Sequence, residues 1–370
     1  MSSSSPLFAT CQPGLEPLLL RELTALDVPA EQVAGGAAFQ GDVETAMRCC
    51  LWLGTASHVR ATIAQFSCRA LGELQRKARD LPWSEWLLPQ VPLAITARAR
   101  RSRVYHTGAI KQRVRDAIAE ALGAVPPARD DPPQATLLVR FDRDTCSIQL
   151  DAAATPLHRR GYRLDGRKAP LREDIAHALV LASGWRSGDA LLDPFCGSGT
   201  IGIEAAAIAL GLPPGRLRAP PFEHTARFDA DTWQRVNQWQ PTTASAPILL
   251  GDRDAGAVAA TAANAERAGV STAIETYHGA LTHSPWLLPG AAPNRGVVVS
   301  NPPYGIRVRG RRDLLPLYQT LGHRLGALGD GWRTALLAHD VRLARRTGLP
   351  LHAAFTTRHG GLSVTAMTTR

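Results

Sequence analysis

The spacing of apolar residues divides the chain into two parts with different patterns. Up to about residue 150, strand-like stretches alternate with amphipathic helices. Leu15, Leu18 and Leu23 share one helix face that follows a short strand and a turn at Pro13-Gly14. Beyond Leu157, the short apolar strands in DALLDPF, APILLGD and RGVVVSN alternate with helical stretches. This alternation predicts an α/β domain built on a doubly wound parallel sheet.

Turn signals add detail to both parts. Gly35-Gly36 and the segment 142–145 are flanked by strand-like residues, which predicts two hairpins, and residues 42–53 have the pattern of a helix. In the second part, a proline-rich stretch from Pro213 to Pro247 interrupts the alternation. We interpret this stretch as an insertion that covers the functional site.

Composition limits the kind of partner. With 370 residues the chain is long enough for two or three domains, and its net charge of +10 indicates an anionic partner, either nucleic acid or a membrane surface. No apolar stretch is long enough to cross a bilayer, and Met1 to Cys11 lacks the features of a secretory signal. Nucleic acid is therefore the preferred partner.

The six cysteines are scattered, without a CxxC pair or a His/Cys cluster. This pattern argues against disulfides and against a metal site, and it is typical of reduced thiols in the cytosol. Lys77, Lys111 and Lys168 are the only lysines, so arginine carries the positive charge. Guanidinium groups bind phosphates bidentately and stack on bases.

A basic run without Asp or Glu is the first candidate RNA-binding feature. It comprises Arg98, Arg100, Arg101, Arg103, Lys111, Arg113 and Arg115. Tyr105 and His106 lie within it, and phosphate contact combined with base stacking needs such a mixture; a solvated basic face is the alternative. A second cluster contains Arg159 and Arg160 and lies at the domain junction. It could guide RNA towards the site or form interdomain salt bridges.

The strongest chemical motif follows a buried strand and opens a helix. It consists of Asp193, Pro194, Phe195, Cys196, Gly197, Ser198, Gly199 and Thr200. Ligands bind at the carboxyl ends of strands in open parallel sheets, and glycines allow a ligand to approach the backbone. With Gly202, the two glycines also satisfy the dinucleotide fingerprint G-x-G-x-x-G. A plain strand-to-helix turn is the alternative.

An acidic residue at the end of the next strand separates the two ligand classes. A nicotinamide enzyme needs such a residue about 20 positions after the glycines. Glu223 has that spacing but lies outside any strand, whereas Asp252 ends the apolar strand of APILLGD. Asp252 is therefore expected to accept hydrogen bonds from both ribose hydroxyls of an adenosine.

The second motif, Asn301-Pro302-Pro303-Tyr304, directly follows the strand of RGVVVSN. An exocyclic amine on a base is a poor nucleophile because its lone pair is delocalised into the ring. The Asn301 side-chain oxygen and the Pro302 carbonyl can accept its two hydrogens and turn the lone pair towards a methyl sulfonium. The prolines fix the loop, and Tyr304 offers a face for base stacking. A rigid strand-to-loop turn is the alternative.

These motifs, in this order, resemble the THUMP-domain RNA guanine-N2 methyltransferases over nearly the whole chain. The likeness extends to LFATCQPGLEPLLLREL, AIKQRVRDAI, LHRRGYR, APLRED and GDRDAGAV. Within the family it is closest to the amino-terminal half of the bacterial bifunctional 23S ribosomal RNA enzymes. The resemblance implies three parts: a ferredoxin-like segment (1–41), a THUMP RNA-binding domain (42–155), and a Rossmann-like class I methyltransferase domain (156–370).

The resemblance also implies roles for individual residues. Asp193 and residues 196–200 would line the methionine part of S-adenosylmethionine, Asp252 would hold its ribose, and Arg172 and Glu173 would lie close to it. The family often has an acid contacting the adenine after the third strand, where this chain has Gly279-Ala280. Backbone groups around Ala280, or His278, would replace that contact, or cofactor affinity would be lower.

Together these expectations describe an enzyme that methylates a guanine flipped out of RNA, with 23S ribosomal RNA as the expected substrate. Transfer RNA is the competing substrate. An adenine-N6 methyltransferase of DNA and a glutamine methyltransferase of protein also use NPPY loops, but the basic module favours nucleic acid and the THUMP likeness favours RNA. An RNA-binding assembly factor without activity and a nicotinamide oxidoreductase are the alternatives from other classes.

Overall fold

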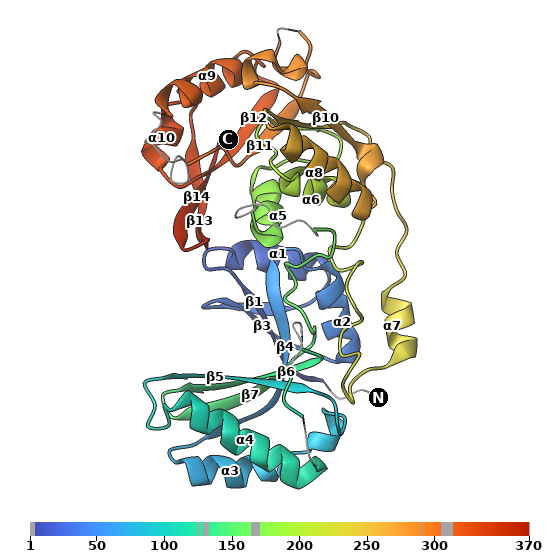
Figure 1. Ribbon diagram of the computed structural model, residues 1–370, viewed down its shortest axis with the longest axis vertical. Helices are drawn as coiled ribbons and strands as arrows, with labels where there is room; N and C mark the ends of the chain where they lie inside the picture. Colours follow the sequence, from blue (N-terminus) through green and yellow to red (C-terminus); the bar gives the residue numbers. More distant parts are fainter. Residues whose placement is uncertain are drawn as a thin grey trace.

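Two seven-stranded sheets, one in each part of the chain, organise the computed structural model (Figure 1). The structure describes residues 4–123, 126–128, 133–163, 171–288, 290–304 and 314–369. The proline-rich loop near residue 130 and part of the basic linker after Arg163, both noted in the sequence, lie partly outside the described residues.

The first sheet is shared by the whole amino-terminal part, which we call the amino-terminal module (residues 4–155). In spatial order its strands are β2 (Ala30–Val33), β3 (Gly36–Gly41), β1 (Ser5–Cys11), β4 (Ala56–Ser67), β7 (Thr145–Asp151), β6 (Ala135–Asp142) and β5 (Leu93–Arg100). All neighbours are antiparallel except β5 and β6. Both predicted hairpins are present, β2–β3 and β6–β7.

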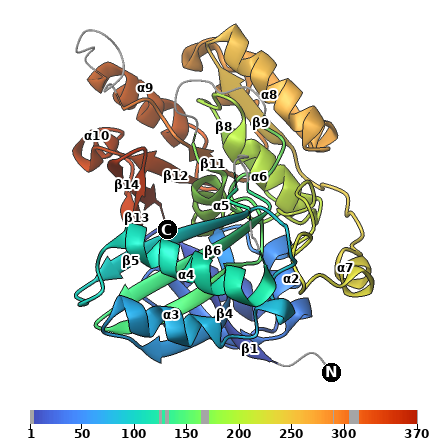
Figure 2. The same cartoon turned by 60° about the horizontal axis from the view of Figure 1, so that its bottom comes forward.

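Four helices cover one face of this sheet: α1 (Glu16–Ala25), α2 (Val43–Trp52), α3 (Leu71–Arg79) and α4 (Thr107–Leu122). The register explains why they share a face. Leu7 pairs with Ala61, Ala61 with Leu150, and Leu150 with Leu137, so these buried side chains point the same way across four strands. They join the helices in one core. Figure 2 shows α3 and α4 side by side over their half of the sheet.

The second sheet has the doubly wound arrangement that the sequence predicts. Its strands in spatial order are β10 (Ile274–His278), β9 (Ile248–Asp252), β8 (Ala190–Asp193), β11 (Gly296–Ser300), β12 (Trp332–Ala338), β14 (Leu362–Thr368) and β13 (His352–His359). The first five are parallel, and β13 and β14 form an antiparallel hairpin at one edge. This order places β8 between β9 and β11, where the strand order reverses.

Helices lie on both faces of the second sheet. The helices are α5 (Glu173–Ala182), α6 (Thr200–Ala209), α8 (Ala255–Arg267), α9 (Leu315–Gly326) and α10 (Val341–Arg345). Val297 and Val299 of β11 pack in the core with α5 and α6, and Val298 packs in the core with α9. Alternate residues of β11 are therefore buried in the cores on the two faces of the sheet, which explains why its apolar residues form a continuous run.

The proline-rich connection from residue 213 to 247 does not cover the candidate site, contrary to the interpretation from the sequence. It contains α7 (Ala230–Val236), which packs against α2 of the amino-terminal module (Figure 1). The Gly215 amide donates to the Leu51 carbonyl (2.8 Å), and the Phe222 amide donates to the Ala152 carbonyl (2.7 Å). The connection runs from the end of α6 to the start of β9, so it leaves the sheet at the edge opposite the carboxyl ends of the strands.

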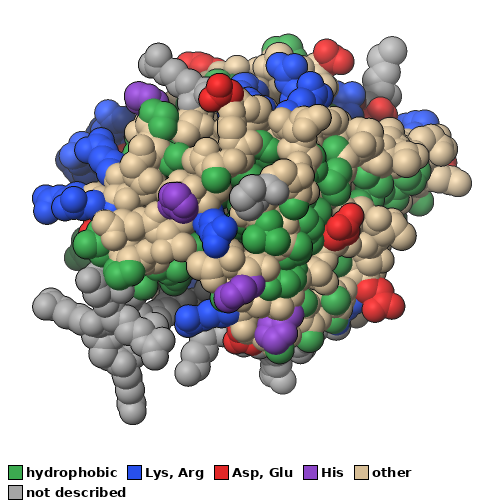
Figure 3. Space-filling view, turned by 90° about the horizontal axis from the view of Figure 1, so that it is seen from above, with side chains coloured by type: hydrophobic (Ala, Val, Ile, Leu, Met, Phe, Trp, Pro, Cys, Tyr) green, Lys and Arg blue, Asp and Glu red, His purple; other side chains and the backbone are tan. Residues whose placement is uncertain are grey.

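Several global expectations can be compared with the described residues. None of their helices is long and apolar enough to cross a bilayer. The six cysteines are buried free thiols. Positive charge is unevenly distributed. Figure 3, which looks onto the end carrying the second sheet, shows most Lys and Arg side chains at the margins and only scattered charged side chains in the middle.

Candidate cofactor and base-binding site

The two sequence motifs meet at one edge of the second sheet. Asp193 ends β8, Asp252 ends β9, and Asn301 follows β11 directly. The parallel register aligns these ends, because Asp193 pairs with Leu250 and Val298 pairs with Leu192. The candidate site is therefore at the switch point between β8 and β11, where open α/β sheets bind their ligands.

The loop between β8 and α6 is shaped by its glycines. Gly197 has φ 56° and Gly199 has φ 81°, in the left-handed region. A Cβ on Gly197 would have no atom within 4 Å, so this position faces open space that a ligand can enter. A Cβ on Gly199 would lie 2.7 Å from the Thr261 methyl group on α8. Gly199 thus serves packing, while Gly197 leaves the backbone accessible.

Asp193 is held at the bottom of this loop. Its carboxylate accepts hydrogen bonds from the Ser300 hydroxyl (2.5 Å) and from the Phe195 amide (3.1 Å). Burial raises the pKa of Asp193 from 3.8 to about 7 and outweighs these hydrogen bonds; the nearby Asp252 raises it further. A buried carboxylate with so high a pKa is poised to bind a cationic group, which would favour its ionised form.

Asp252 bridges the glycine loop and the next helix. One carboxylate oxygen accepts from the Gly197 amide (3.0 Å) and the other from the Asp254 amide (2.9 Å). Asp252 itself is only partly buried. Its position at the rim leaves it accessible to a ligand, but its contact with a ribose stays a prediction.

Ala280, proposed to replace the adenine-contacting acid, also lies at this edge. His278 pairs with Asp252 at the end of β10, and the Gly279 amide donates to the Asp252 carbonyl (2.9 Å). Ala280 itself is exposed and precedes the short helix η3 (Leu281–His283). The structure therefore brings the backbone of this segment beside Asp252, as an adenine contact would require.

The loop from Asn301 to Tyr304 is fixed by its own hydrogen bonds. The Tyr304 hydroxyl donates to the Asn301 side-chain oxygen. The Tyr318 hydroxyl on α9 donates to the Pro303 carbonyl (3.4 Å), and the His339 ring lies 6.0 Å from that of Tyr304. The sequence analysis missed Ser300, Thr261, Tyr318 and His339. Of these four residues, only Ser300 could have been found from the sequence, because it directly precedes the Asn301–Tyr304 motif.

Arg172 and Glu173 lie at the start of α5, facing the domain junction. The Arg172 guanidinium binds Asp174 (2.6 Å) and donates to the Ser57 hydroxyl of β4 (3.2 Å). Glu173 pairs with Arg163 (3.4 Å), which donates to the hydroxyl of Thr200 at the start of α6 (2.6 Å). Glu173 thus reaches the glycine loop through Arg163, and direct cofactor contacts of Arg172 and Glu173 stay predictions.

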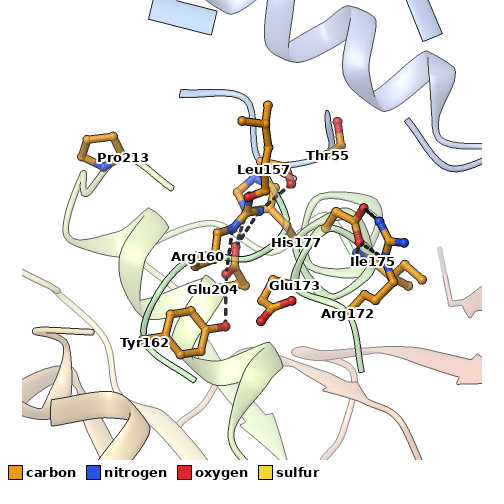
Figure 4. A network of polar contacts seen from close by, with 12 residues as sticks. Thr55, Leu157, Arg160, Tyr162, Arg172, Glu173, Ile175, His177, Glu204 and Pro213 are labelled. Carbon is orange, nitrogen blue, oxygen red and sulfur yellow. Dashed lines mark hydrogen bonds and ion pairs between the residues drawn. The ribbon is translucent and has the colours of Figure 1, made fainter. Parts of the chain in front are cut away.

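A buried polar network joins the two domains (Figure 4). Arg160 is 2% exposed; its guanidinium pairs with Glu204 of α6 (3.3 Å) and donates to the Gly54 carbonyl of the amino-terminal module (2.5 Å). The prediction that Arg160 binds RNA is therefore wrong, because its donors are consumed inside the protein. The interdomain alternative applies to it, whereas Arg159 is exposed.

His177 extends the same network. It lies between Glu204 (3.0 Å) and Glu22 of α1 (3.3 Å). Burial alone would lower the pKa of His177, but hydrogen bonds to both carboxylates raise it from 6.5 to about 9. The pKa of Glu204 is lowered to about 2, because Arg160 and His177 outweigh the effect of burial. The domains are thus joined by buried charges as well as by apolar contacts.

The basic run from Arg98 to Arg115 does not form one surface. Arg98 and Arg100 lie exposed on β5, whereas Lys111 and Arg113 are exposed on α4, which covers the other face of the sheet. Arg101 and Arg103 lie in the β5–α4 connection. Arg115 lies on α4, where it is partly buried and donates to the Leu93 carbonyl. The structure thus separates two basic surfaces within one sequence run.

Three protein families match consecutive parts of the chain. The RlmL ferredoxin-like domain matches residues 6–60, the THUMP domain matches 68–151, and the RMKL-like methyltransferase domain matches 160–367. These matches and the two sheets confirm the fold class expected from the sequence.

Curated relatives extend over the same length. The chain is 35% identical to the ribosomal RNA large subunit methyltransferase K/L of Syntrophotalea carbinolica, covering 98% of this chain and 53% of the relative. The corresponding protein of Methylococcus capsulatus is 33% identical over 98% of this chain and 50% of its own length. The chain therefore spans about half the length of these relatives.

Solved structures share the full architecture. A protein described as a methyltransferase, SMU.472, complexed with SAH, has a TM-score of 0.88 at 26% identity, covering 100% of this chain and 98% of its own. A Listeria monocytogenes protein described as a predicted N6-adenine-specific DNA methylase has a TM-score of 0.85 at 26% identity, covering 98% and 96%.

Proposed function

Because the chain belongs to the RMKL-like methyltransferase family, we propose that it transfers a methyl group from S-adenosylmethionine to the exocyclic amine of a guanine in RNA. Large-subunit ribosomal RNA is the proposed substrate. The relatives named as ribosomal RNA large subunit methyltransferases and the THUMP domain support this choice. The observation that carries it is the Asn301–Tyr304 loop at the switch point beside Asp193.

The residues at this edge fit S-adenosylmethionine. Gly197 leaves open space above the loop, Asp193 offers a buried acceptor, and Asp252 offers a second acceptor at the rim. The SMU.472 structure, complexed with SAH, supports the same cofactor here. Asp193 would hold its cationic amino-acid part and Asp252 its ribose. When bound, the cofactor supplies an electrophilic methyl group on a sulfonium.

The chain's contribution to the reaction is mainly orientation. An amide oxygen has two lone pairs, so Asn301 Oδ1 can keep its bond from Tyr304 and also accept from the guanine amine. The Tyr304 hydroxyl donates to Asn301 Oδ1, so this bond orients the Asn301 amide with its oxygen, and not its nitrogen, towards Tyr304. The Pro302 carbonyl accepts the second hydrogen, and the lone pair is turned towards the methyl carbon. The nitrogen–carbon bond forms as the sulfur–carbon bond breaks, and the nitrogen then releases a proton to solvent.

The test is transfer of labelled methyl groups to unmodified transcripts of large ribosomal RNA and of transfer RNA, with nucleoside analysis of the products. Asn301→Ala, with its cofactor affinity checked, serves as the control. Methylguanosine confined to ribosomal RNA supports the proposal. Label in transfer RNA overturns the substrate, and methyladenine in an added duplex DNA, as the Listeria relative's description suggests, overturns the base. Cofactor binding without transfer would favour the assembly-factor alternative.

A further inference from the structure

The face of the first sheet opposite its helices carries a basic trough. Side chains that alternate with the core residues point to this face: Phe8 and Arg60 are cross-strand partners, as are Arg140 and Arg98. The hollow has a volume of about 840 Å³ and reaches across β1, β4, β7, β6 and β5. We call it the sheet trough.

The sheet trough carries a net positive charge. Five arginines line it, with Asp142 as its acidic residue. Arg60, Arg140 and Arg172 are ion-paired with Asp151, Asp142 and Asp174, and burial lowers the pKa of His158 to about 4, so this side chain is uncharged at neutral pH.

Arg98 and Arg140 are partners in the parallel β5–β6 pair, and Asp142 lies 3.4 Å from the Arg140 guanidinium. Burial lowers the pKa of Arg60, and Arg98 lowers it further against the opposing effect of Asp151. Within the described parts of the chain, Arg98 and Arg100 form no ion pair. A bound anion would relieve the repulsion between Arg60 and Arg98.

The shape of the trough suits a flexible, extended ligand. Its floor includes the small polar side chains Ser147 and Gln149, and its walls include Gly35 of the β2–β3 turn and Arg172 of α5. The five strands span four intervals of about 4.8 Å, or about 19 Å. At a spacing of about 3.4 Å per stacked nucleotide, that length accommodates about six nucleotides.

One wall of the trough belongs to the catalytic domain. Arg172 lines the trough and precedes Glu173, which contacts Arg163, and Arg163 donates to Thr200 at the glycine loop. A strand lying in the trough therefore ends beside the domain that holds the candidate site. Phe8, partly exposed next to Arg60, provides an aromatic ring on which a base can stack.

We propose that the sheet trough binds an unpaired segment of the RNA substrate next to the target base, with Arg98 and Arg140 contacting phosphates and Phe8 stacking on a base. The proposal rests on the proposed function for its ligand class. It differs from the expectation drawn from the sequence, because it assigns RNA to the open sheet face and excludes the α4 surface from this contact.

The test compares trough variants with a matched charge change on α4. The double variant Arg98→Gln/Arg140→Gln and the single variant Phe8→Ala remove the proposed contacts. Lys111→Gln/Arg113→Gln removes two charges from the exposed side of α4 as the control. The probes are a fluorescein-labelled RNA 12-mer of mixed sequence and the same strand annealed to its complement. Fluorescence anisotropy gives Kd at several salt concentrations.

The trough proposal predicts a distinct result for each variant. In the double variant, losing two phosphate contacts makes the negative slope of log K against log salt less steep by about 1.4 for the single strand. Losing the stacked base in Phe8→Ala raises its Kd by about 5- to 150-fold. The α4 control changes neither quantity. Tighter binding of the duplex by the wild type, or equal effects of the trough and α4 variants, would overturn the proposal.

Methyl-transfer assays on the same preparations separate the two proposals. The trough variants are expected to raise KM for RNA while leaving kcat and cofactor Kd unchanged. If the wild type methylates RNA and the trough variants match it in KM and in single-strand binding, the trough proposal is wrong and the proposed function stands. If the trough variants lose single-strand binding but the wild type transfers no methyl group to any RNA, the proposed function fails alone.

Discussion

His177 makes a measurable contribution to stability that depends on pH. Its side chain is 6% exposed and lies between Glu22 and Glu204, one from each domain. The pKa of His177 rises from 6.5 to about 9, a difference of 2.5 units (9 − 6.5). Each unit corresponds to about 1.4 kcal/mol, so the protonated form stabilises the folded state by about 3 kcal/mol.

The sign of the effect follows from the raised pKa. The folded protein binds the proton more tightly than the unfolded chain, so the stabilisation is complete below pH 6.5 and is lost as the pH rises through about 9. We therefore expect the free energy of unfolding to fall by about 3 kcal/mol between pH 6.5 and 9.5. His177→Gln should remove this dependence. Because it takes the imidazolium away from the largely buried Glu22 carboxylate, while Glu204 keeps Arg160, it should also cost about 3 kcal/mol near neutral pH.

The measurement is urea unfolding followed by tryptophan fluorescence at several pH values across this range. The control is His352→Gln, which makes the same change at an exposed position on β13. It should retain the pH dependence of the wild type. Equal loss of stability with pH in His177→Gln and in the wild type would refute the reasoning, as would a flat profile in the wild type.

Three further predictions follow from the geometry. Gly199→Ala should weaken cofactor binding and lower the Tm, because φ is 81° and the new Cβ would lie 2.7 Å from Thr261; calorimetric titration and thermal unfolding measure this. Cofactor affinity should fall about tenfold per pH unit below pH 7, where Asp193 becomes protonated, and Asp193→Asn should abolish that slope in titrations from pH 5.5 to 8. Gly14→Ala should destabilise the protein by more than 1 kcal/mol in urea unfolding, because φ is 87° and the new Cβ would overlap the Thr356 carbonyl on β13; an unchanged midpoint would contradict it.

The meeting of the two motifs at one sheet edge could be predicted from the sequence because each motif is local. Asp193 and the glycines follow one apolar strand without interruption, and Asn301 directly follows another. Parallel strands in a doubly wound sheet must bring such ends together. The roles of individual site residues and the domain limits 1–41, 42–155 and 156–370 stay predictions. The structure adds that β4 pairs with strands of both amino-terminal segments, so these segments share one sheet.

The sequence could not show which residues distant along the chain share a surface or a contact. Arg98 and Arg113 are 15 positions apart (113 − 98), but one lies on a strand and the other on a helix across the sheet. Arginine is a common phosphate ligand, but Arg160 is a buried structural cation because it pairs with Glu204, 44 residues later, and donates to the Gly54 carbonyl. Nothing in the spacing of residues 213–247 indicates that they reach back to α2.

The interdomain network also has a consequence for biosynthesis. The Glu22 carboxylate is synthesised early, but its partners His177 and Glu204 follow much later, Glu204 by 182 residues (204 − 22). At a synthesis rate of about 5–20 residues per second, the Glu22 side chain waits about 9–36 s for Glu204. During that interval the face of α1 that later meets α5 is exposed on the nascent chain. The emerging polypeptide therefore passes through a stage in which a chaperone could engage it, and that stage ends only when translation has passed α6.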